Sequence, residues 1–185
     1  MEFGPIEALD KRGSRVVLRS LRVEDGDDLA RFQAQGSRDS EFFPWSPGCS
    51  GLTQDNAADY IAGFAAAERE ILLGAFDEGE LVAIAELSGM GDWPFFKHRC
   101  AIAPGVLKSH WRRGLASMLM NTMSDIARSV GYEQSEASVD FLNERSYAWC
   151  LSLGFEDCGF LRHAEKRSDG TYRDYHRLVK KLLED

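Results

Sequence analysis

Long apolar runs and an excess of basic residues are both missing from this sequence. No window approaches the roughly 18 consecutive apolar residues that a membrane-spanning helix needs, and the start, MEFGPIEALDKRG, lacks the basic and apolar segments of a secretory signal. The formal net charge is −8, whereas nucleic-acid binding relies on clustered lysine and arginine. We therefore expect a cytoplasmic protein that binds neither membranes nor nucleic acid.

Paired cysteine motifs and linker-like stretches are also missing. The four cysteines, Cys49, Cys100, Cys150 and Cys158, show no Cys-x-x-C spacing, so neither a disulfide framework nor a metal site is expected. No stretch rich in proline, glycine or serine divides the 185 residues, of which 44% are hydrophobic. That content suffices for one core, and we expect a single domain over residues 1–185.

The acidic charge is concentrated in the first half of the chain. Residues 1–96 hold 8 lysines and arginines against 18 aspartates and glutamates, whereas residues 97–185 hold 14 against 12. The first half is therefore suited to a cationic substrate, and the second half tolerates phosphates.

Hydrophobic periodicity predicts a mixed α/β chain. The segment from Val17 through Leu21 indicates a strand, and the LARFQAQG segment that follows is helical in pattern. Thr53 is placed to cap a second helix, and a strand hairpin should turn at Asp77 to Gly79. Further along we expect a strand in HRCAIAPGVL with a bulge or splay at Pro104-Gly105, a helix from Leu115 closed by Gly131, a strand in SEASV, a helix between Asn143 and Gly154, and a last hairpin turning at Ser168 to Gly170.

The segment VLKSHWRRGLASMLM places positive charge at a predicted helix start. A helix N-terminus presents backbone N–H groups and a partial positive charge, and therefore suits an anion. Arg112 and Arg113 would add charged donors, while Gly114 and Ala116 would let a phosphate approach the amides. A surface loop with solvated arginines is the alternative, and the segment alone does not decide between them.

Two motifs together resemble the GNAT superfamily of acetyl-CoA-dependent N-acetyltransferases. In the first, Q/R-x-x-G-x-G/A, the small positions are Gly114 and Ala116, and Trp111 replaces the usual Gln or Arg, as it also does in relatives that acetylate protein N-termini. The second, N-x-x-A/S-x-x-x-Y-x-x-x-G-F, is matched by Asn143, Ser146, Gly154 and Phe155, with Cys150 in place of the tyrosine. The segments FFPW, TQDNAADYI and DGTYRD look most like the ribosomal-protein-alanine N-acetyltransferase branch.

The resemblance implies a fold and a co-substrate. The fold would be a mixed, mostly antiparallel sheet with a splayed strand pair, flanked by helices. Acetyl-CoA would be the co-substrate, with no metal. Its phosphates would lie on the amides of the loop, and its pantetheine arm along the splayed strand. The implied contact residues are Val106, Leu107, Arg112, Arg113, Gly114, Leu115, Ala116, Ser117 and Asn143.

Catalysis requires a base for the amine and benefits from an acid for the leaving thiolate. Cys150 and Ser146 are the alternatives for the acid, and Glu86 and Glu165 are the alternatives for the base, although solvated carboxylates would look the same.

The acceptor would be a protein N-terminal α-amine or a small amine such as a polyamine, amino sugar or antibiotic. Phe42, Phe43 and Trp45 could line its pocket or simply pack against the sheet. A catalytically inactive acyl-CoA-binding domain is the competing function, and a homodimer stays open.

Overall fold

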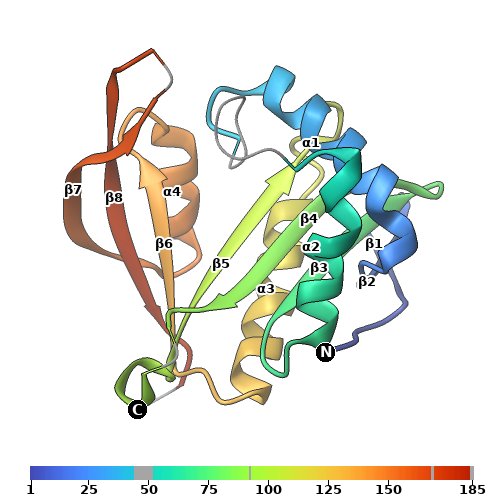
Figure 1. Cartoon of the computed structure of the whole chain (residues 1–185), viewed down its shortest axis with the longest axis horizontal. Helices are drawn as coiled ribbons and strands as arrows, with labels where there is room; N and C mark the ends of the chain where they lie inside the picture. The colour runs from blue at the N-terminus through green and yellow to red at the C-terminus, as the bar shows by residue number, and fades with distance from the viewer. Residues whose placement is uncertain (44–51, 92, 168, 184–185) are drawn as a thin grey trace. The chain divides into compact units, whose positions relative to one another are not determined.

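The computed structural model describes residues 1–43, 52–91, 93–167 and 169–183. Within these residues the chain forms eight strands and four α-helices (Figure 1). They are β1 (Ile6–Leu9), β2 (Arg15–Ser20), α1 (Gly26–Asp39), α2 (Gln54–Ala66), β3 (Ile71–Asp77), β4 (Glu80–Gly89), β5 (Arg99–Val106), α3 (Leu115–Ser129), β6 (Gln134–Asp140), α4 (Glu144–Ser152), β7 (Glu156–Lys166) and β8 (Tyr172–Lys181).

The strands form one mixed sheet in the order β1-β2-β3-β4-β5-β6-β8-β7. The pairs β1/β2, β2/β3, β3/β4, β6/β8 and β7/β8 are antiparallel, and β5 and β6 are parallel. The predicted mixed, mostly antiparallel sheet with flanking helices is thereby confirmed. Pro104 and Gly105 lie inside β5, and the splay expected there stays a prediction.

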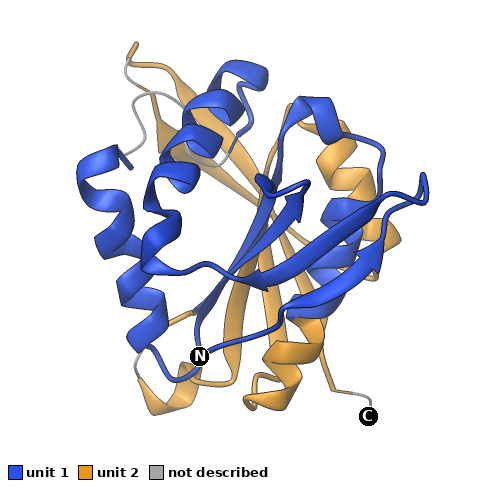
Figure 2. Cartoon of the chain, turned by 90° about the vertical axis from the view of Figure 1, so that its right-hand side faces the viewer, with its two compact units in different colours: residues 1–88, 103–123 blue, residues 89–102, 124–185 orange. Residues whose placement is uncertain are grey.

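The chain divides into two compact units, shown in Figure 2. Unit 1 contains residues 1–88 and 103–123, and unit 2 contains residues 89–102 and 124–185. The single domain expected from the sequence stays a prediction.

One hydrophobic cluster of unit 1 lies between its strands and the two helices α1 and α2, which cover the same face (Figure 1). Leu29 and Phe32 of α1 and Ile61 of α2 are almost fully buried there, together with Leu72 and Ile84 of the sheet. Helix α2 begins where the sequence predicted, because Thr53 and Asn56 form a reciprocal capping box. The helices therefore follow from apolar periodicity and capping.

Strand β1 was not predicted from the sequence. It has only four residues, too few for a distinct alternating pattern, and it forms because Ile6 to Leu9 pair with Arg15 to Leu18 of β2. Asp10 closes the connecting turn, since its Oδ1 accepts the N–H groups of Arg12 and Ser14 at 2.8 and 2.9 Å. This short strand places the β1–β2 turn, residues 10–14, beside the loop that precedes α3.

Unit 2 contains α4 and the β6-β8-β7 portion of the sheet. Asn143 caps α4 by accepting the N–H of Ser146 at 3.1 Å, and Gly154 follows the helix with φ +85°. The predicted helix and its two boundaries are confirmed. Ser168 of the expected β7–β8 turn is outside the described residues. No helix in the described part of the chain is long and apolar enough to cross a membrane.

Candidate active site

The loop before α3, residues 107–114, contains a short 3₁₀ helix at Lys108–His110 and two residues with left-handed backbone. Arg112 and Gly114 have φ of +64° and +85°, and α3 starts at Leu115. The helical hydrogen bond nearest to this start runs from the Met118 N–H to the Gly114 carbonyl at 3.0 Å. The amides of residues 115–117 precede that bond in the chain, which is where an α-helix presents donors to an anion.

The guanidinium of Arg113 is engaged by two carboxylates of unit 1. Its Nε donates to Asp10 Oδ2, and its Nη1 donates to Asp77 Oδ2 at 2.6 Å. The residue is only 7% exposed, and the hydrogen bond to Asp10 raises its pKa, which keeps it charged. The side chain therefore projects neither as a charged donor to a phosphate nor as a solvated surface arginine, the two alternatives left open by the sequence, and the role proposed for Arg113 is restricted to its backbone.

The two carboxylates also contact other parts of the loop. Burial opposes the ionisation of Asp10, but the hydrogen bonds from Arg113 and from the backbone of Ser14 and Arg12 lower its pKa overall. Asp77 Oδ2 additionally lies 3.2 Å from His110 Nε2. The loop is thus held at two points, one on the β1–β2 turn and one at the end of β3.

Gly114 is in close contact with Lys11 of the β1–β2 turn. A Cβ at this glycine would lie 2.8 Å from Lys11 Cγ, and the Lys11 N–H donates to the Arg113 carbonyl at 2.9 Å. Both the positive φ and this contact favour glycine here. The sequence had suggested a different reason, room for a phosphate.

Residues 106 and 107 connect β5 to the loop. The Leu107 N–H donates to the Val82 carbonyl at 3.0 Å, and the Trp111 indole donates to the Val106 carbonyl at 2.8 Å. Trp111, which occupies the position usually held by Gln or Arg in the motif, thus joins the loop to the end of β5.

Glu86 is the candidate base in unit 1. It is half-buried on β4, and its carboxylate accepts the Tyr60 hydroxyl from α2 and the Ser88 hydroxyl at 2.6 Å. Burial and the hydrogen bond to Glu86 raise the pKa of Tyr60, which keeps the phenol protonated as a donor. The Glu86 carboxylate is therefore held in place by two hydroxyl groups.

The acid candidates Ser146 and Cys150 lie on α4 in unit 2. Cys150 is 2% exposed, and burial raises the pKa of its thiol to about 11. The thiol is therefore a weaker acid than an ordinary tyrosine phenol, whose pKa is about 10. Ser146 lies one turn earlier and is partly exposed. Asn143, expected to bind the pantetheine arm, uses its side-chain oxygen to cap α4.

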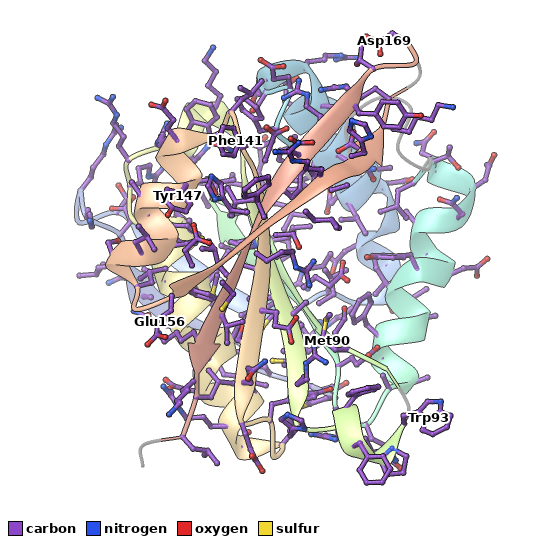
Figure 3. All side chains as sticks on the ribbon, turned by 90° about the vertical axis from the view of Figure 1, so that its left-hand side faces the viewer. Met90, Trp93, Phe141, Tyr147, Glu156 and Asp169 are labelled. Atoms are coloured by element: carbon purple, nitrogen blue, oxygen red, sulfur yellow. The ribbon has the colours of Figure 1, made fainter. Side chains whose placement is uncertain are left out.

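Glu165, the other base candidate, lies on β7 and accepts the hydroxyl of Tyr175 from β8. Sequence reasoning missed an aromatic cluster in the same unit: Tyr147 donates to Asp157 at 2.7 Å, and its ring lies 4.1 Å from that of His176. Phe141 stacks on His176 with ring centroids 4.9 Å apart, and Phe141 and Tyr147 are labelled in Figure 3. Tyr147 directly follows Ser146 in the second motif, but nothing in the sequence indicated its partners.

The predicted residues are divided between the two units. Glu86 and residues 106–117 belong to unit 1, whereas Asn143, Ser146, Cys150 and Glu165 belong to unit 2. Of the aromatic loop, Phe43 is buried against Phe32 with ring centres 5.5 Å apart. It packs into the core of unit 1. Trp45 lies outside the described residues.

Comparisons with known proteins identify the family and show similar folds. The model of the acetyltransferase (GNAT) family matches residues 34–155. A GNAT acetyltransferase from Streptococcus pneumoniae superimposes with a TM-score of 0.81 at 18% identity, covering 90% of this chain and 99% of that one. YncA from Salmonella typhimurium, solved with its cofactor acetyl-CoA, gives 0.78 at 17% identity, covering 92% and 95%.

A ribosomal-protein-alanine N-acetyltransferase from Brucella melitensis also gives a TM-score of 0.78, at 20% identity, covering 89% of this chain and 98% of that one. It is one of several kinds of acetyltransferase among the similar structures. A search of the curated proteins finds no significant match. The family match covers more than half of the sequence, and the chain belongs to the GNAT family of acetyltransferases.

Proposed function

We propose that this protein transfers the acetyl group of acetyl-CoA directly to the nitrogen of an amine, and that a protein N-terminal α-amine is the preferred acceptor. The observation that carries the proposal is the loop before α3, whose left-handed Arg112 and Gly114 lead into the amides of residues 115–117. Backbone donors and the helix dipole at this place suit the phosphates of CoA. Val106, Leu107 and Asn143 are proposed for the pantetheine arm.

The chemistry requires no covalent enzyme intermediate. The amine nitrogen attacks the thioester carbonyl, the C–N bond forms, and the tetrahedral intermediate collapses by breaking the C–S bond to release CoA thiolate. One proton of the attacking amine passes to a base, and the thiolate takes up a proton. An α-amine has a pKa near 7.7–8.0 and a lysine side chain one near 10.4. A weak base therefore suffices for an α-amine at neutral pH.

We assign the base to Glu86 and leave Glu165 as its alternative. Two hydroxyl donors, Tyr60 and Ser88, hold the Glu86 carboxylate in one orientation, which favours proton transfer over a fixed path. Ser146 is the α4 side chain we assign to the leaving thiolate, through its hydroxyl or a water, because the Cys150 thiol is buried and weakly acidic.

The test follows release of CoA thiol from acetyl-CoA with a matched panel of acceptors. A peptide with a free N-terminus, the same peptide with its α-amine blocked and a lysine in its sequence, a polyamine and an amino sugar separate the acceptor classes. We expect turnover with the free peptide and at least about tenfold less with the blocked one, because of the pKa difference. Faster turnover of a small amine than of the free peptide would show that the acceptor is a small amine and not a protein N-terminus. Tight acetyl-CoA binding with no turnover on any amine would favour the inactive binding domain.

A further inference from the structure

We propose that Asp10 and Asp77 are positioning residues that act through Arg113 to fix the phosphate-binding loop. The inference rests on the proposed function, because the loop is the site we assign to the CoA phosphates. It assigns a binding role to the β1–β2 turn, which contains neither of the two sequence motifs. Arg113, the second arginine of WRRG, then acts by orienting the backbone of its neighbours.

The contacts restrain the loop from two directions. Arg113 joins Asp10 of the β1–β2 turn to Asp77 at the end of β3, and its carbonyl accepts the Lys11 N–H at 2.9 Å. Its side chain is 9% exposed, and that of Asp10 is 0% exposed. A charged group buried to this degree is strongly tied to its partners, because releasing either one leaves an uncompensated charge.

The restraint acts on a stretch of backbone whose conformation would be unfavourable without it. Arg112 has φ +64°, a region that L-residues other than Asn, Asp and His rarely adopt. It lies between Trp111, whose indole is bonded to the Val106 carbonyl, and Arg113. Fixing the residues on both sides holds Arg112 in this conformation and aims the following amides before any ligand arrives. Such preorganisation improves affinity by removing the entropic cost of ordering the loop.

The two carboxylate oxygens of Asp10 have different partners, so one substitution can break one set of contacts and keep the other. Oδ1 accepts the two turn amides of Arg12 and Ser14, whereas Oδ2 accepts Arg113 Nε. In Asp10→Asn the amide oxygen can keep the two turn bonds, but the amide NH2 then faces Arg113 and cannot accept its proton. Asp77→Ala removes the other partner of Arg113 and keeps the inference testable should the Asp10 variant fold poorly.

Asp25→Asn is the matched control. Asp25 is also buried, at 8% exposed, and holds Arg19 through two bonds of 2.6 and 2.8 Å. Its hydrogen-bond partners, Arg19 and Arg22, both lie outside the loop. Breaking this pair should cost stability as breaking a buried ion pair does. The control therefore separates a general loss of stability from a displaced loop.

The experiment measures dissociation constants for acetyl-CoA and for S-acetylpantetheine, which lacks the phosphates and the nucleotide, by calorimetric or NMR titration. We expect Asp10→Asn and Asp77→Ala to raise the dissociation constant of acetyl-CoA about tenfold and that of S-acetylpantetheine by no more than about twofold. Both dissociation constants should be nearly unchanged in Asp25→Asn. Unchanged acetyl-CoA affinity in the loop variants, or equal weakening of both ligands, would overturn the inference. A wild-type protein that binds acetyl-CoA no more tightly than acetylpantetheine would instead overturn the phosphate site itself.

Discussion

Asp10 and Arg113 are 103 residues apart in the chain, yet the Asp10 carboxylate accepts the Nε–H of Arg113. The bond links the turn after the first strand to the loop before α3. It explains why one arginine of the WRRG segment is buried in a chain whose charged residues are mostly solvated. The consequences can be measured in stability, in ligand affinity and in catalysis.

Replacement of Gly114 by alanine should destabilise the protein and weaken acetyl-CoA binding. The left-handed φ costs an alanine roughly 1–2 kcal/mol, and contact with Lys11 adds to that cost. Gly79→Ala is the control, because Gly79 has φ +88° with no atom near its Cβ position. Urea unfolding should show the larger loss for Gly114→Ala, and only that variant should bind acetyl-CoA more weakly. Equal losses would mean that the Lys11 contact is unimportant.

Glu86→Gln should lower kcat by about tenfold or more, since general-base catalysis commonly contributes 10²–10⁴-fold. The amide cannot take the amine proton, although it can keep an acceptor for Tyr60. Glu165→Gln is the comparison on β7. The rate of CoA thiol release at saturating acetyl-CoA decides between them. A normal rate in Glu86→Gln together with a slow rate in Glu165→Gln would transfer the assignment to Glu165.

Ser146→Ala and Cys150→Ala should affect different quantities. Cys150 is buried with a pKa of about 11, so its loss should cost about 1 kcal/mol of stability and leave kcat within about twofold. Ser146 is partly exposed, and its loss should lower kcat while barely changing the melting temperature. A Cys150→Ala variant that is stable but inactive would show that the thiol is the proton donor after all.

Acid should destabilise unit 1 through its buried aspartates. Burial raises the pKa of Asp25, but the hydrogen bonds from Arg19 and Arg22 lower it below the ordinary value of 3.8 in the folded state, and the pKa of Asp10 is lowered as well. A depressed folded pKa adds stability that is fully present above the unfolded value and is lost as the pH falls through the folded one. Unfolding free energies measured from pH 6 to 3 should therefore decline below about pH 4. The decline should be shallower in Asp25→Asn, and an identical slope would contradict the assignment.

Much of the architecture can be predicted from local pattern. Apolar spacing from Leu115 and the glycine at position 131 locate α3, while Thr53 and Asn143 mark the starts of α2 and α4. These features depend on neighbours within a few residues, which the sequence displays directly. Strand β1 was missed because four residues acquire strand character only by pairing with β2.

The sequence by itself determined the family, through Gly114, Ala116, Asn143 and the glycine-phenylalanine pair at the end of α4, and it located the loop that we assign to the CoA phosphates. Only the tertiary structure decided what the side chains of that loop do. The sequence shows Arg112 and Arg113 as equivalent charges, whereas the fold buries Arg113 between Asp10 and Asp77. Such pairing brings together a turn, a strand end and a loop that are up to 103 residues apart in the chain, and no local pattern encodes it.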